Sequence, residues 1–247
     1  MNYKVNINGI DVEATYSQEN IDDIIIPLLK KLSDIHSLQN RRVIAMLAAP
    51  PGTGKSTLVS FLEYLAKEII PEKKVQAIGM DGFHKRQEYL TSHTTIVDGK
   101  ELPMVDIKGA PITFDLDGLK AKIKELLSKD ICMWPQYDRL LHNPVEDAIV
   151  VDGDIVLLEG NYLLLEAEGW SDISDLADYT ISIVADPDML RERLIARKIA
   201  SGNSRDKAEK FVDFSDMANV KTCLEGSKKA DLELSVDLNG LLHKQDE

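Results

Sequence analysis

The sequence predicts an α/β fold of three layers, in which helices flank a mainly parallel five-stranded sheet. Five apolar runs are too short for helices and have the length of buried strands: RVIAMLAA, KVQAIGMD, DIVLLEG, DYTISIVAD and ADLELSVD. Helical patterns lie between these runs, among them GKSTLVSFLEYLAKEI, DLDGLKAKIKELLSK and PDMLRERLIARKIASG. Strands that alternate with helices need crossover connections, which cover both faces of a parallel sheet. With 247 residues, of which 44% are hydrophobic, the chain is long enough for one good-sized core.

Two elements are expected before the first strand of this sheet. The segment YKVNINGIDVEATY alternates around Asn8-Gly9, a pair that favours a tight turn, and so predicts a short antiparallel hairpin. In SQENIDDIIIPLLKKLSDIH, apolar residues recur at helical spacing after two possible N-caps, Ser17 and Asn20. Pro27 indicates a bend or an early start of this helix. We therefore expect a hairpin and helix extension at 1–40, packed on a domain at 41–247.

The composition argues against several classes of protein. A formal net charge of −13 disfavours nucleic acid and anionic membrane surfaces as partners. Cys132 and Cys223 lie far apart in the sequence, which argues against a disulfide framework or a zinc site and favours two small buried side chains. The first residues lack a basic start with an apolar stretch, and no apolar run reaches the roughly 18 residues of a membrane span. A soluble, cytoplasmic protein is expected.

A phosphate-binding loop is predicted where the first sheet strand meets the following helix. The stretch APPGTGKS at 49–56 fits the pattern G-x-x-x-x-G-K-[ST], except that Ala49 replaces the first glycine. Small residues let backbone N–H groups curl around phosphates at a helix N-terminus. Nucleotide contacts are expected from Pro51, Gly52, Thr53, Gly54, Lys55, Ser56 and Thr57. The Lys55 ammonium would reach the β- and γ-phosphates, and the Ser56 hydroxyl would bind magnesium. The alternative is a glycine-containing turn followed by a surface lysine.

Asp81 ends the second apolar strand, at the edge where parallel α/β sheets place their ligands. A carboxylate there can accept the proton of an attacking hydroxyl group during phosphoryl transfer. It can also merely cap a turn before Gly82. From this residue alone, both alternatives stay open.

Four segments that follow the phosphate loop in order resemble the phosphoribulokinase, uridine kinase and pantothenate kinase family of P-loop kinases. They are DGFH at 81–84, KGAPITFD at 108–115, PQYDRLLHNP at 135–144 and LLEGNYLLL at 157–165. The resemblance covers about residues 41–236 and leaves the N-terminal extension outside. It implies the three-layer P-loop kinase fold, ATP and Mg²⁺ as cofactors, a small-molecule acceptor and Asp81 as the catalytic base.

The resemblance also implies roles around the metal and the acceptor. Glu159 matches an acidic residue near the magnesium ion, which suits a cation that prefers oxygen ligands. Tyr137 and His142 have the separation of a tyrosine and a histidine that contact the nucleoside in uridine kinases. The chain departs from uridine kinases at His84, where they have a tyrosine, and at Pro144, where they have an arginine. We assign His84 to the substrate-binding group, with Asp81, Tyr137 and His142.

A lid is expected at 191–215, where the resemblance places a lid helix. Arg193 and Arg197 lie four residues apart, hence on one helix face, and would grip phosphate oxygens during transfer. Solvent-facing arginines are the alternative. Asp216 and Asn219 match an aspartate and asparagine pair after the family's lid, and Gly202 is either a hinge or a helix C-cap.

A loop over the acceptor is expected at 85–111, since this stretch lacks clear periodicity and exceeds the usual loop length. Within it, IVDGKEL predicts a small hairpin that turns at Asp98-Gly99. The resulting hypothesis is an ATP- and Mg²⁺-dependent kinase that phosphorylates a hydroxyl group of a nucleoside or sugar. A pantothenate kinase and a non-catalytic ATP-binding sensor are the alternatives, and a homodimer is possible.

Overall fold

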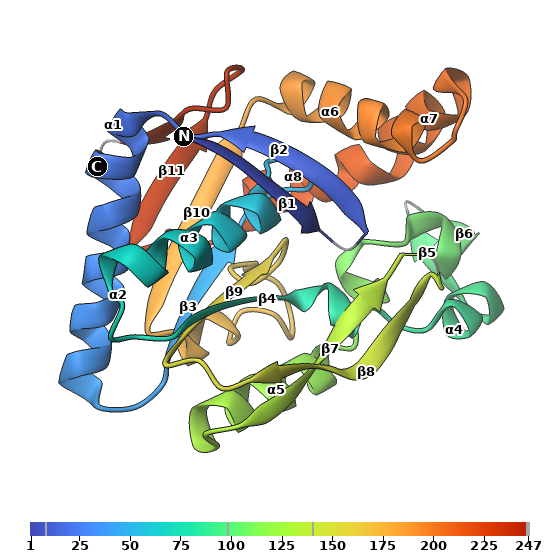
Figure 1. Ribbon diagram of the computed structural model, residues 1–247. Coiled ribbons are helices and arrows are strands. Elements are labelled where there is room, and N and C mark those ends of the chain that lie inside the picture. The colour runs from blue at the N-terminus through green and yellow to red at the C-terminus, as the bar shows by residue number, and fades with distance from the viewer. Residues whose placement is uncertain (8, 98, 140, 246–247) are drawn as a thin grey trace.

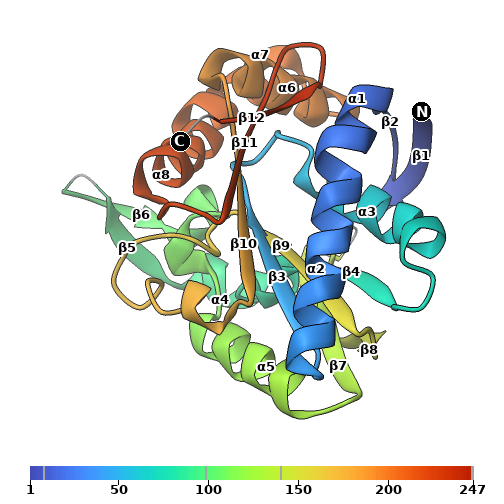
Figure 2. The same cartoon turned by 90° about the vertical axis from the view of Figure 1, so that its left-hand side faces the viewer.

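A six-stranded sheet runs through the computed structural model, which describes residues 1–7, 9–97, 99–139 and 141–245. Its strand order is β12-β11-β10-β3-β9-β4 (Figures 1 and 2). The five strands from β11 to β4 pair in parallel, which confirms the predicted sheet. β12 pairs antiparallel with β11 at one edge and is an addition to the predicted strands, because three residues carry no recognisable pattern.

The sheet consists of β3 (Val43–Ala48), β4 (Val75–Gly79), β9 (Ile155–Gly160), β10 (Tyr179–Ala185), β11 (Leu232–Val236) and β12 (Leu242–Lys244). Three further hairpins pair β1 (Asn2–Ile7) with β2 (Ile10–Thr15), β5 (Thr94–Val97) with β6 (Lys100–Pro103), and β7 (Cys132–Asp138) with β8 (Asn143–Val151). The α-helices are α1 (Gln18–Asn20), α2 (Ile26–Gln39), α3 (Lys55–Ile69), α4 (Gln87–Ser92), α5 (Leu116–Ser128), α6 (Pro187–Ala200), α7 (Arg205–Phe211) and α8 (Met217–Gly226). Two π-helical turns, Ile21–Ile25 and Val212–Asp216, join α1 to α2 and α7 to α8.

Two apolar clusters cover the two faces of the sheet. Every residue of β3 is buried, and its side chains alternate between the clusters. Val43 and Leu47 join the cluster that contains α2 and α3, whereas Ile44 and Met46 join the one that contains α5 and β7. A strand that is covered on both faces is apolar throughout. Helices pack on both sides of this sheet, which confirms the three predicted layers.

The N-terminal hairpin lies along α3 (Figure 1). Tyr16 stacks on the ring of Phe61 in α3 with centroids 4.0 Å apart, and Tyr3 meets the same ring edge-on at 5.2 Å. Gly9 has a φ of +86°, which a tight hairpin turn requires. Asn8, the other residue of the predicted turn, lies outside the described residues, as does Asp98 of the turn predicted between β5 and β6.

The predicted lead-in helix is continuous from α1 to α2. Ser17 is the N-cap: its hydroxyl accepts a hydrogen bond from the Asn20 N–H at 3.0 Å. Pro27 lies in the first turn of α2, directly after a π-helical turn, so the hydrogen-bond pattern changes where the proline lacks a donor. Leu29 and Leu32 of α2 are fully buried in the same apolar cluster as Val43 and Leu47 of β3.

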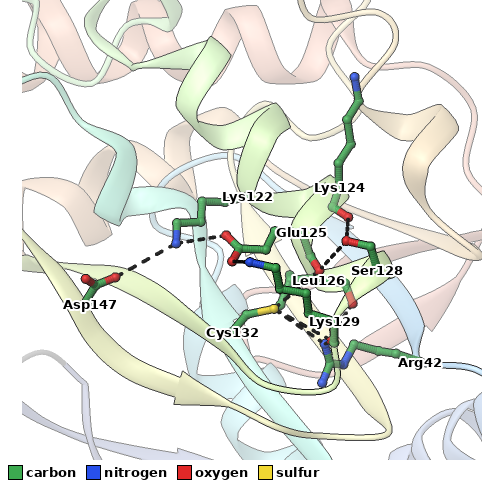
Figure 3. A network of polar contacts seen from close by, with 9 residues as sticks. All are labelled: Arg42, Lys122, Lys124, Glu125, Leu126, Ser128, Lys129, Cys132 and Asp147. Atoms are coloured by element: carbon green, nitrogen blue, oxygen red, sulfur yellow. Dashed lines mark hydrogen bonds and ion pairs between the residues drawn. The ribbon is translucent and has the colours of Figure 1, made fainter.

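Arg42, which precedes β3, binds carbonyl groups at the end of α5 (Figure 3). Its guanidinium donates to the Leu126 carbonyl at 2.8 Å, to the Lys129 carbonyl at 2.6 Å and to the Asp130 carbonyl. Its Nε donates to the Gly153 carbonyl at 2.8 Å. The last carbonyl groups of a helix have no partner within the helix, so Arg42 supplies partners and ties α5 to the sheet.

The β7–β8 hairpin is absent from the sequence-based assignment. Its register shifts between Trp134 and Gln136, around Pro135, and this irregularity breaks the alternation on which a strand prediction depends. Both cysteines are buried, as expected. Within the described ranges, no helix combines the length and apolarity that crossing a membrane would require.

Candidate active site

The predicted phosphate loop joins β3 to α3 at the carboxyl edge of the sheet. Gly52 and Gly54 have φ values of +90° and +93°, a region that glycine enters at little cost. Thr53 closes the loop by donating its hydroxyl hydrogen to the Pro50 carbonyl at 2.8 Å. Ala49 is buried and has no positive φ, so its methyl group is accommodated in place of the usual glycine.

Lys55, Ser56 and Thr57 begin α3, directly after the loop. The first N–H groups of a helix have no partner within it, and the helix dipole attracts an anion to this end. Lys55 has no ion-pair partner among the described residues, so its ammonium group is available to a ligand. Loop, helix terminus and lysine together form a site that suits a chain of phosphates.

Ser56 and Glu159 meet beside this helix terminus. The Ser56 hydroxyl donates to Oε1 of Glu159 at 2.7 Å. Glu159 lies near the end of β9, between Leu47 of β3 and Gly79 of β4 in the register. Burial raises the pKa of the Glu159 carboxyl, and the nearby Lys55 ammonium opposes this effect.

These two oxygen donors fit a magnesium ion. Three His, Cys, Asp or Glu side chains do not cluster anywhere in the described part of the chain, as a metal site made by protein alone would require. Magnesium in a phosphate-transfer site takes one or two protein oxygens and completes its shell with water and phosphate oxygens. Ser56 and Glu159 could supply that share.

Asp81 lies in a 3₁₀ turn, Met80–Phe83, that follows β4. The carbonyl of Asp81, not its carboxylate, closes the turn: it accepts from the His84 N–H at 3.2 Å and lies 2.8 Å from His84 Nδ1. The carboxylate is therefore available to a ligand. Asp81, Ser56, Tyr137 and Glu159 line one cavity of about 190 Å³, which we call the acceptor cavity.

His84 and Tyr137 form an aromatic group next to Asp81. The His84 ring lies 4.1 Å from Phe114 and 5.0 Å from Tyr137, measured between centroids. Burial lowers the pKa of His84, and the Asp81 charge opposes this effect. Burial also raises the pKa of Tyr137 to about 12. Both rings are therefore uncharged at neutral pH.

Lys108 connects this aromatic group to the β7–β8 turn. Its Nζ lies 5.0 Å from the centroid of the Tyr137 ring and donates to Gln87 Oε1 at 2.7 Å and to the His142 carbonyl at 3.0 Å. His142 is exposed with a φ of +52°, and its carbonyl makes this contact. Among the predicted substrate-binding residues, Asp81 and Tyr137 line the acceptor cavity and His84 adjoins Tyr137, while the predicted role of the His142 side chain stays a prediction.

A second cavity, of about 450 Å³, lies on the other side of the phosphate loop. Thr53, Gly54 and Thr57 line it together with Arg193 of α6. Val236 of β11 and residues 238–240 after that strand complete this part of the lining. Arg193 Nη1 lies 3.5 Å from the Gly52 carbonyl. We call this hollow the donor cavity, because a nucleotide whose phosphates occupy the loop would extend its nucleoside into a space of this kind.

The predicted lid consists of α6 and α7, which lie above the sheet in Figure 1. Gly202, with a φ of +92°, donates its N–H to the Ile199 carbonyl at 2.9 Å and ends α6 directly after the C-cap residue Ser201. Burial lowers the pKa of Arg197, whereas the Asp216 and Asp81 charges raise it, so Arg197 lies within electrostatic reach of both carboxylates. Arg193 instead faces the donor cavity.

Asp216 and Asn219, which follow the predicted lid segment, are both buried. Lys198 lies 3.8 Å from Asp216 Oδ2, yet that oxygen has no hydrogen-bond partner in the described part of the structure. Burial raises the pKa of the Asp216 carboxyl. Buried oxygens in proteins normally accept a hydrogen bond. Asp216 Oδ2 could therefore accept one from a ligand or after a movement of α6 and α7.

Sequence reasoning missed several residues at the site. The sequence gives no role to Lys108, or to Arg139, whose charge acts on Glu159, Tyr137 and Arg197. The available signal is that both residues lie inside segments that carry the family resemblance. Ile7 lines the acceptor cavity from β1. Nothing in the sequence points to it, because the family resemblance does not include the N-terminal extension.

Strand, phosphate loop and helix define the class of the protein as a P-loop nucleotide-binding fold with ligand sites at the carboxyl edge of its sheet. No family model matches the chain. An uncharacterized protein of Escherichia coli K12, YggC, is 40% identical over 244 residues, or 98% of this chain and 99% of that protein. A Schizosaccharomyces pombe protein named "Putative uridine kinase" is 30% identical over 218 residues, or 85% of this chain and 87% of that protein.

Further matches carry the names of kinases. A pantothenate kinase of Limosilactobacillus reuteri is 24% identical over 73% of this chain and 62% of that enzyme. A crystal structure described as a "putative fructose transport system kinase" from Silicibacter sp. TM1040 has a TM-score of 0.76 and 27% identity over 85% of this chain and 98% of that one. The chain belongs to the phosphoribulokinase, uridine kinase and pantothenate kinase family of P-loop kinases.

Proposed function

We propose that this protein transfers the γ-phosphate of ATP, with Mg²⁺, to a hydroxyl group of a small molecule, and that the acceptor is a nucleoside or a sugar. One observation carries the proposal: Asp81, Tyr137, Ser56 and Glu159 line a single cavity beside the N-terminus of α3. A base, an acceptor contact and two oxygen donors for a metal thus adjoin a phosphate-binding helix terminus.

In the mechanism that follows, the backbone of residues 51–57 and the Lys55 ammonium hold the phosphates of the donor. Ser56 and Glu159 would hold magnesium, which when bound neutralises charge on the β- and γ-phosphates. Asp81 orients the acceptor hydroxyl and takes its proton as the oxygen attacks phosphorus. Arg193 and Arg197 bind phosphate oxygens, and their charge is most useful while the phosphoryl group is in transit.

The names of two relatives support the proposed acceptor class. One names uridine as its substrate, and the other names fructose transport. The acceptor would lie against Tyr137, whose ring packs beside His84, since an uncharged ring next to Asp81 suits a polar molecule with a flat or C–H face. A His142 contact from the β7–β8 turn would complete this side.

Pantothenate is a second candidate, and Lys108 favours it. Its ammonium lies 5.0 Å from the centroid of the Tyr137 ring and donates to two uncharged oxygens. No carboxylate pairs with it in the described ranges. A partly buried cation of this kind can bind the carboxylate of an acceptor. A pantothenate kinase is also among the relatives.

The test is ADP release by the purified protein with Mg²⁺ and ATP, against uridine, D-ribose, D-fructose and pantothenate. One acceptor should raise the rate strongly, and Asp81→Asn should lower that rate by about 10²- to 10⁴-fold while ATP still binds. Asp106→Asn is the matched control, because Asp106 is an exposed aspartate outside the cavity. Its rate should equal the wild-type rate.

The rival is a sensor that binds ATP without transferring phosphate. It predicts ATP binding, no stimulation by any of the four acceptors, and no difference between Asp81→Asn and the Asp106→Asn control. That result would overturn the kinase proposal. A cytoplasmic location and a homodimer stay predictions.

A further inference from the structure

The N-terminal hairpin β1–β2 borders both cavities of the candidate active site. Ile7, the last residue of β1, lines the acceptor cavity together with Val59 of α3 and Ile149 of β8. Residues 12–16, from β2 into the segment that follows it, line the donor cavity beside Arg193. Figures 1 and 2 show the hairpin next to α3, the helix that separates these two linings.

The hairpin is held firmly on the helix that begins at the phosphate loop. Tyr16 stacks on Phe61 at 4.0 Å, and Tyr3 packs edge-on against the same ring at 5.2 Å. The Tyr3 hydroxyl lies 2.8 Å from the Ser60 hydroxyl and donates to the Ser60 carbonyl at 3.1 Å. Since Phe61 is fully buried, the hairpin has a defined position relative to the phosphate loop and can act as a preorganised wall.

The side chains that the hairpin contributes have a definite chemistry. Ile7 gives the acceptor cavity an apolar side chain, as Val59 and Ile149 do, and Asn6 of the same strand adds a polar one. Such a surface suits the C–H face of a sugar or the ring of a nucleoside. At the donor cavity, Val12 and Ala14 add apolar surface to that of Val236, Leu238 and Leu242, which suits the flat face of a nucleotide base.

We infer that the N-terminal hairpin is a specificity-determining wall of both binding sites, with Ile7 shaping the fit of the acceptor and Ala14 the fit of the donor's base. The inference rests on the proposed kinase function. It assigns a role to a segment that lies outside the residues of the family resemblance.

The first experiment compares Ile7→Ala with Val5→Ala. Val5 lies two residues earlier on the same half-buried face of β1 but lines neither cavity, so it controls for weakened packing of the hairpin. With the best acceptor among uridine, D-ribose, D-fructose and pantothenate, Ile7→Ala should raise the acceptor KM about 3- to 10-fold relative to Val5→Ala. The KM for ATP and the melting temperature should change equally in the two variants.

The second experiment needs no acceptor. Ala14→Leu adds bulk to the wall of the donor cavity and should weaken ATP binding about 5-fold or more. Binding of inorganic tripolyphosphate, which has the phosphates but no base, should be unchanged. Ala121→Leu is the matched control, because Ala121 is exposed on α5 and lines neither cavity.

The outcomes separate this inference from the proposed function. Two results together would show that the hairpin is only structural. Ile7→Ala and Val5→Ala would have equal effects, and Ala14→Leu would bind ATP and tripolyphosphate as the Ala121→Leu control does. Turnover of none of the four acceptors would count against the kinase proposal, and the two binding constants would still decide the role of Ala14. A wild-type protein that binds tripolyphosphate but not ATP would overturn both.

Discussion

At the scale of single residues, the site combines buried titratable groups whose pKa values move in opposite directions. Burial lowers the pKa of His84, and Asp81, Lys108 and Arg139 are the charged groups that face it. Burial raises the pKa of Glu159. Each of these shifts makes the uncharged form more favourable in the folded protein, so both side chains contribute to the dependence of stability on pH.

The His84 shift predicts a loss of stability in mild acid. Below the ordinary histidine pKa of about 6.5, the unfolded chain binds a proton that folded His84 resists, so the free energy of unfolding falls as the pH falls. Above that pH, His84 contributes nothing to this slope. Relative to wild type, His84→Asn should therefore gain up to about 1.4 kcal/mol per pH unit between pH 6.5 and the lowered pKa.

Urea unfolding at pH 7, 6 and 5 checks this prediction. The difference between variant and wild type removes the opposite contribution of Glu159, which both proteins share. Two unfolding free energies that run parallel from pH 7 to pH 5 would show that folded His84 titrates normally.

At the scale of elements, side-chain hydrogen bonds between distant segments help to join a helix to the sheet. Arg42 is the main example, since one side chain serves four carbonyl groups at the end of α5 and before β9. The nearby Glu125 pairs with Lys122 and Lys129 at the surface of the same helix (Figure 3). The Arg42 contacts join α5 to the segment before β9, whereas the Glu125 ion pairs connect side chains at α5 and its C-terminal end only.

Arg42→Met should destabilise the protein by about 1.5–3 kcal/mol, because it leaves the carbonyl groups of Leu126 and Gly153 without their charged donor. Urea unfolding measures the change. Lys129→Met, which removes only an exposed pair with Glu125, serves as the control and should have little effect. Similar midpoints for the two variants would mean that water replaces Arg42 at no cost.

At the scale of the whole molecule, the N-terminal extension shares its core with the sheet. Leu29 of α2 is fully buried in the cluster that contains Val43 of β3 and Phe61 of α3. An extension of this kind should unfold together with the phosphate loop, although it lies before the predicted kinase domain in sequence.

Leu29→Ala tests this coupling. A cavity at a fully buried leucine should lower the free energy of unfolding by about 2–5 kcal/mol in a single transition. Leu38→Ala on the same helix is the control, because Leu38 is 87% exposed and should change little. A separate early transition, with the remaining unfolding curve unchanged, would instead identify the extension as an independent unit. Far-ultraviolet circular dichroism during urea titration distinguishes the two results.

The sequence by itself determined the features that depend on neighbours along the chain. β3, the glycine loop and α3 are contiguous, so the pattern around Lys55 and Ser56 predicted their local structure. Asp81 and Glu159 could also be placed, because the ends of adjacent parallel strands meet at one edge of a sheet.

Only the tertiary structure decided which distant segments complete the cavities. Ile7 reaches the acceptor cavity because the aromatic contacts of Tyr3 and Tyr16 seat the hairpin on α3. Lys108 reaches Tyr137 through a hydrogen bond to the His142 carbonyl, in a turn that no periodicity predicts. Such contacts arise from the packing of whole elements, and the free energy that selects them is distributed over residues far apart in the sequence.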